Sequence, residues 1–116
     1  MTDYLEIEKK ALVAILKFLA HADGKLTENE IVQFQNLAEK KGFKDFRKIF
    51  KKVDSEIKTL NDFSSYVNSI FDKEKRLDIL QQAIEMAGVD YITSEEKDII
   101  RYLSRVWEIP VEKLNP

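Results

Sequence analysis

Residues 20–30 read AHADGKLTENE, and this stretch predicts a helix end, a tight loop and a helix start. Gly24 suits the left-handed conformation that commonly follows a helix, because glycine has no Cβ to clash there. Thr27 and Glu30 have the spacing of a capping box, in which each side chain accepts the backbone N–H of the other residue. We therefore expect one helix to end near Ala22 and the next to begin at Glu28.

The same pattern occurs again in the second half of the chain. Leu12, Ile15, Leu19 and Ala22 recur 65 positions later as Leu77, Leu80, Ile84 and Ala87. Leu26, Thr27, Glu30, Phe34 and Leu37 recur 66 positions later as Ile92, Thr93, Glu96, Ile100 and Leu103. The extra position falls in the second loop. A unit of helix, loop and capped helix is therefore predicted twice, with two further helices between the copies.

Apolar residues at helical spacing extend this prediction over the whole chain. The expected helices are 3–22, 28 to about 40, one carrying Phe43, Phe46, Phe50 and Val53, one carrying Phe63 to Phe71 and capped by Thr59, Asn61 or Asp62, 73–87, and one from the second capping box to before Pro110. Ile31, Phe34, Leu37 and Ala38 form the expected buried stripe of the second helix, and Val111 and Leu114 a short terminal turn. The predicted fold is all-α, a single-domain bundle of about six to seven helices over residues 1–116.

Composition excludes several classes of function. The formal net charge is −2, with acids and bases interspersed, so no overall field attracts nucleic acid and none is expected as a partner. There is no cysteine, which excludes disulfides and thiolate metal sites and is typical of a reducing compartment. The apolar run 11–20 is too short to span a bilayer and lacks signal-peptide flanks. We expect a cytoplasmic protein.

The 20–30 stretch resembles the pattern A-x-A-D-G-x-apolar-[ST]-x-x-E of the TerB-like (tellurite-resistance protein B) family, and is similar to the N-terminal domain of DjlA-type co-chaperones. The weaker second copy, residues 87–96, lies where that family has its second such loop. The resemblance covers nearly the whole chain. It implies an all-helical bundle, a link to tellurite or general stress responses, and metal association through acidic residues at these loops.

The acidic residues of the two loops are the candidate metal ligands: Asp23, Glu30, Asp90 and Glu96. Carboxylate oxygens suit hard cations such as Ca²⁺ or Mg²⁺. The first loop is not an EF-hand, because Leu19 and His21 occupy positions one and three, where carboxylates are required. A second interpretation stays open, in which these side chains only cap helices and satisfy loop N–H groups.

A basic stretch between residues 40 and 52 gives a different hypothesis. It contains Lys40, Lys41, Lys44, Arg47, Lys48, Lys51 and Lys52, interleaved with Phe43, Phe46 and Phe50. Such a helix could dock another protein or the surface of an anionic membrane. The alternative is that the phenylalanines fill the core while the lysines face solvent, and an exposed aromatic would separate the two.

Other candidate residues favour structural roles. His21 has no neighbouring Cys or second His, and Tyr91 and Trp107 are expected to pack. No nucleophile with its base and no glycine-rich phosphate loop is present in the sequence, so we expect no enzymatic activity. The predicted function is a non-enzymatic TerB-like stress-response module that binds a divalent cation or another protein at its acidic loops.

Overall fold

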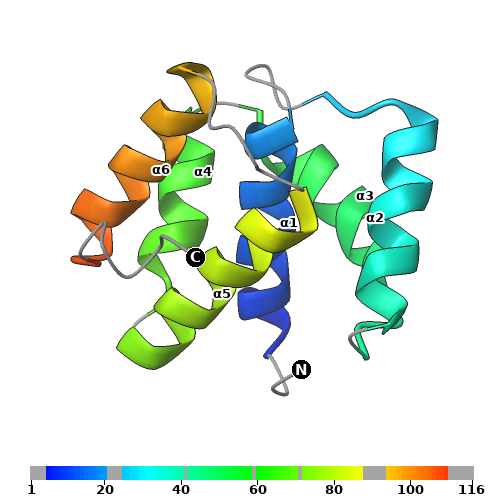
Figure 1. The fold of residues 1–116 in the computed structure, drawn as a ribbon, viewed down its shortest axis with the longest axis horizontal. Helices are drawn as coiled ribbons and strands as arrows, with labels where there is room; N and C mark the ends of the chain where they lie inside the picture. The colour runs from blue at the N-terminus through cyan, green and yellow to red at the C-terminus, as the bar shows by residue number, and fades with distance from the viewer. Residues whose placement is uncertain are drawn as a thin grey trace.

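Six α-helices make up the described part of the chain, which contains no strand (Figure 1). The computed structural model describes residues 5–20, 25–40, 42–58, 60–70, 72–87 and 94–109, with the backbone alone at 60, 87 and 94–98. The helices are α1 (Glu6–Ala20), α2 (Glu28–Lys40), α3 (Phe46–Glu56), α4 (Leu60–Asn68), α5 (Lys73–Ala87) and α6 (Ser94–Val106). The all-α prediction is confirmed, as are the start of α2 and both ends of α5.

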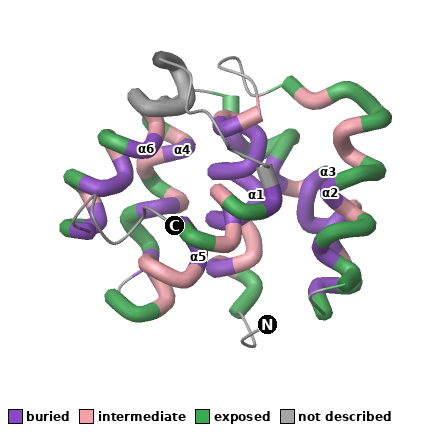
Figure 2. Tube along the Cα trace, viewed as in Figure 1, coloured by how far each residue is buried: buried purple, intermediate pink, exposed green. Residues whose placement is uncertain are grey.

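Helix α1 lies at the centre of the bundle. Every residue from Ala11 to Lys17 is buried, so the helix is covered on all sides and not along one stripe (Figure 2). It packs against α3, α4, α5 and α6, most extensively against α5, whereas α2 packs on the outside against α3 and α5. The resulting body measures 31 × 29 × 28 Å along its principal axes.

Aromatic side chains fill the spaces between the helices. Phe18 meets Phe63 edge to face, with ring centroids 5.1 Å apart, which joins α1 to α4. Trp107 is 1% exposed, and its indole N–H donates to the Val67 carbonyl at 2.7 Å. This bond satisfies the polar atom of a buried indole and fixes the end of α6 against α4.

Helices α2 and α6 have the same kind of C-terminal cap, made by different residues. Gly42 follows α2 with φ +88°, and the Phe43 N–H donates to the Ala38 carbonyl at 2.8 Å. Glu108 takes the corresponding place after α6 with φ 56°, and the Ile109 N–H donates to the Ser104 carbonyl at 2.9 Å. Both are C-terminal caps that need a left-handed residue, a conformation that favours glycine.

Three local predictions are corrected. Leu37 was predicted to be buried, but it is 37% exposed because α2 packs through Phe34 and Ala38 instead. Phe43 is buried in the turn before α3 and not in the helix itself. Since α4 already begins at Leu60, neither Asn61 nor Asp62 is its N-cap; Asp62 instead accepts the Lys58 N–H from the first turn. The predicted terminal turn at 111–114 lies outside the described residues.

No helix in the described ranges is long and apolar enough to cross a membrane.

Candidate functional site

The first corner, between α1 and α2, contains the predicted capping box. The Thr27 N–H donates to Glu30 Oε1 at 2.8 Å, and the Glu30 N–H donates to Thr27 Oγ1 at 3.2 Å. The two reciprocal bonds satisfy N–H groups that have no partner within the helix, and a negative side chain also suits the positive end of the helix dipole. The sequence pattern alone was sufficient to predict this geometry.

Glu30 is the one predicted metal ligand whose side chain the structure describes. Asp23 and Asp90 lie outside the described residues, and Glu96 belongs to the part of α6 where only the backbone is described. One carboxylate oxygen of Glu30 accepts the Thr27 N–H, so this side chain caps the helix. Among described residues, no group of three or more acidic or histidine side chains could hold a metal ion. The metal-site prediction therefore stays a prediction.

The two repeated units lie together in the fold. Their first helices, α1 and α5, pack against each other in the core. In Figure 1, α1 ends and both α2 and α6 begin at the upper side of the molecule. Three of the four helix ends that flank the two loops therefore lie on one side of the bundle.

Helix α3 carries the second part of the basic stretch, from Arg47 to Lys52, and the phenylalanines of the stretch are buried. Phe43 is 1% exposed, Phe46 0% and Phe50 8%, so the prediction that they fill the core is confirmed. Ile49 and Val53 complete the same buried stripe. At about 100° per residue, the opposite face of the helix holds Lys48, Lys51 and Ser55, all exposed, and Lys44 is exposed in the turn just before it.

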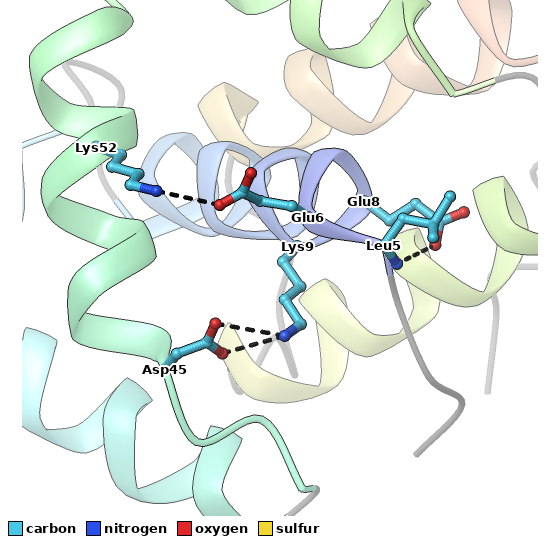
Figure 3. A network of polar contacts seen from close by, with 6 residues as sticks. All are labelled: Leu5, Glu6, Glu8, Lys9, Asp45 and Lys52. Carbon is cyan, nitrogen blue, oxygen red and sulfur yellow. Dashed lines mark hydrogen bonds and ion pairs between the residues drawn. The ribbon is translucent and has the colours of Figure 1, made fainter.

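The two flanks of α3 are occupied by ion pairs with neighbouring helices. The pairs are Lys52–Glu6 at 3.1 Å, Lys17–Asp54 at 2.9 Å, Lys10–Glu56 at 3.6 Å and Arg47–Glu28 at 2.6 Å. Lys9 also pairs with Asp45, the residue before α3, at 3.2 Å (Figure 3). Sequence analysis counted Arg47 and Lys52 as part of an available basic stretch, but both are engaged within the molecule.

The ion pair nearest the start of α1 affects the pKa of Glu6. A hydrogen bond from Lys52, together with its charge, lowers the pKa of the Glu6 carboxyl (Figure 3). Two residues further on, Glu8 is buried and its Oε1 accepts the Leu5 N–H at 2.7 Å, which ties down the start of the helix. These contacts attach the start of α1 to α3 and order its first turn.

Lys17 is a buried charged residue that sequence analysis did not single out. Its side chain is 4% exposed in the last turn of the central helix, with Nζ 2.9 Å from Asp54 Oδ1 and 5.9 Å from the centroid of the Phe50 ring. The signal available in the sequence was a lysine interrupting the apolar run 11–20. A lysine stem packs well in apolar surroundings when its ammonium reaches a partner, so this lysine is part of the α1–α3 contact.

Of the three remaining candidates, the structure describes one. Trp107 packs in the core, as predicted. His21 and Tyr91 lie outside the described residues.

A family model described as tellurite resistance protein TerB matches residues 9–115. Comparisons with curated proteins and with solved structures return no match. The match covers α1 from Lys9 onward, all of α2 to α6, and both copies of the repeated unit. The chain therefore belongs to the TerB family of tellurite-resistance proteins.

Proposed function

We propose that this TerB-family chain acts by binding and does not catalyse a reaction, and that its binding surface consists of the two acidic corners. The ligands would be Asp23 and Glu30 at the first corner and Asp90 and Glu96 at the second, holding Ca²⁺ or Mg²⁺ or contacting a partner protein. The observation that supports this most directly is the repeated corner itself, in a chain whose family is tied to tellurite resistance. The cytoplasmic location expected from the sequence stays a prediction.

The geometry of the first corner suits such a role. The capping box holds the Glu30 carboxylate against the first turn of α2, so that the side chain is already ordered before any ligand arrives. An ordered ligand loses less conformational entropy on binding. The packing of α1 against α5 also favours a joint surface, since these helices lead into the two loops.

Titration with Ca²⁺ and Mg²⁺, followed by NMR of the backbone amides, tests the cation hypothesis. Binding predicts shifts for amides around both Asp23 and Asp90, and loss of both sets in the Asp23→Asn/Asp90→Asn variant. Glu74→Gln, which removes an exposed carboxylate elsewhere, is the control. Amides that stay unmoved at millimolar ion in the wild-type chain would remove the metal role.

Two variants at the first corner separate a ligand from a cap. Glu30→Gln keeps an oxygen that can accept the Thr27 N–H but removes the charge, so it should weaken cation binding with little change in stability. Thr27→Ala removes the capping hydroxyl but leaves the carboxylate, so it should cost about 1 kcal/mol of stability and keep cation binding. If Glu30→Gln lowers the stability but leaves cation binding unchanged, Glu30 is only a cap.

A second candidate function is docking of a protein or an anionic membrane through α3. The observation that favours it is the exposed lysine face of α3, on which no described residue is acidic. Burial of the phenylalanines removes any mode in which their rings enter a bilayer. Contact with a membrane through this helix would rest on lysine charge alone.

A further inference from the structure

The outward face of α3 differs from the rest of the basic stretch in its contacts. We use the name lysine ridge for Lys44, Lys48 and Lys51, which are exposed and make none of the ion pairs found along the flanks of α3. Lys48 and Lys51 are three residues apart and lie on one side of α3, and Lys44 lies in the turn just before the N-cap of the helix. The ridge is a row of three positive charges on a protein of net charge −2.

The flanking contacts hold this row in place. Arg47 on one side is bonded to Glu28 and to Gln35 of α2, and Lys52 on the other side is bonded to Glu6 of α1. Phe46 and Phe50 anchor the opposite face of the helix in the core. Because the helix is attached along both flanks and its inner face, the ridge is presented on a rigid element.

We propose that the lysine ridge docks an acidic helical segment of a partner protein. This inference rests on the second candidate function above and specifies its partner. Carboxylates spaced four and three residues apart on a helix form a row on one side, which can face Lys48 and Lys51 on α3 and Lys44 in the turn before it. A membrane is a poorer fit, because three lysines without an apolar side chain to insert fall short of the clusters of about four to eight that bind anionic lipid.

Lysines of this kind steer a partner more than they hold it. Exposed lysine–carboxylate pairs are individually weak and screened by salt, whereas a patch of one sign speeds the encounter with the opposite sign. The ridge is therefore expected to raise the association rate and to set the register of the acidic segment. Binding should weaken as the ionic strength rises to about 0.15 M, where the Debye length is about 8 Å.

The probe is a synthetic helical peptide with three glutamates spaced four and three residues apart, and its control has the same composition with the glutamates spread around the helix. We expect the matched peptide to shift amides of residues 44–55, and the spread peptide to bind several-fold more weakly. Lys44→Glu/Lys48→Glu/Lys51→Glu should weaken binding by at least about tenfold. Circular dichroism and thermal unfolding establish that the variant is folded.

Matched variants make the result specific. Lys73→Glu/Arg101→Glu/Arg105→Glu changes the net charge equally at exposed positions outside the ridge and should leave binding unchanged. A lysine peptide of the same spacing should bind the charge-reversed ridge, which would show that the row itself is recognised. Asp23→Asn/Asp90→Asn should bind the acidic peptide normally, so failure at the corners and failure at the ridge are separable.

Three results would overturn the proposal. The first is equal binding of the matched and spread peptides. The second is equal loss of binding in the ridge variant and in its charge-matched control. The third is ridge-dependent binding to vesicles of equal parts phosphatidylglycerol and phosphatidylcholine without binding to the peptide, which would assign the ridge to lipid.

Discussion

The two helix–loop–helix units have the same sequence pattern, but the first unit buries its leading helix more deeply and the second unit buries its trailing helix more deeply. In the first unit the leading helix is central: Leu12 and Leu19 are 0% and 1% exposed, whereas their counterparts Leu77 and Ile84 are half-buried. In the trailing helices the order reverses, because Leu37 is 37% exposed and its counterpart Leu103 is 0% exposed. A repeated pattern therefore specifies the helices, while position in the bundle decides which residues form the core.

The largest test of this contrast is truncation of equivalent leucines in the trailing helices. Leu103→Ala should cost about 2–5 kcal/mol, since a fully buried side chain leaves a cavity. Leu37→Ala should cost less than about 1 kcal/mol, because that side chain already contacts water. Urea denaturation measures both. Ile15→Ala and Leu80→Ala, both at fully buried equivalent positions, are the control pair and should cost similar amounts. Equal costs for Leu37 and Leu103 would break the contrast.

A smaller effect is expected at Lys17, whose counterpart 65 positions later is Gln82. Lys17 has its partner in Asp54, whereas Gln82 Oε1 is buried with no hydrogen-bond partner in the described part of the chain. Asp54→Ala should cost about 1–2 kcal/mol, a value reduced by the 59% exposure of the Asp54 side chain. Lys17→Met should be nearly neutral, because the replacement keeps the packing and removes the buried charge. A large loss in Lys17→Met would contradict a purely structural role for this ion pair.

The C-terminal caps of the trailing helices give a third contrast. Gly42→Ala should cost about 1–2 kcal/mol from backbone strain alone, since an added Cβ would meet nothing within 4 Å. Glu108→Gly should stabilise the protein by up to about 1 kcal/mol, because it relieves the same strain after α6. Thermal unfolding measures both changes. Glu108→Ala keeps the strain and removes the weak 3.9 Å pair with Lys73, so it should change little. Stabilisation by alanine equal to that by glycine would exclude strain as the cause.

Local patterns predicted what depends on neighbours in sequence. Helix periodicity and the Thr27–Glu30 spacing were sufficient for the helix order, the start of α2 and the capping bonds. They could not show that Leu37 faces water, because burial depends on which helices pack around α2. They also could not separate Arg47 and Lys52 from the lysine ridge, since Glu28 and Glu6 are distant in sequence and meet α3 through the tertiary fold alone.

The smallest expected effect concerns the attachment of the leading helix α1 to α3 through Glu6. Because the pair with Lys52 lowers the pKa of Glu6, the folded state binds this proton less readily than the unfolded chain does. The stabilisation is therefore present above the pKa of the unfolded chain, about 4.3, and is lost as the pH falls through the lower folded value. Carbon-detected NMR titration should find the Glu6 carboxyl titrating below its ordinary range, and Lys52→Met should return it toward that range. A Glu6 pKa unchanged by Lys52→Met would mean that the pair does not form in solution, and that α1 is held to α3 by packing and the remaining ion pairs.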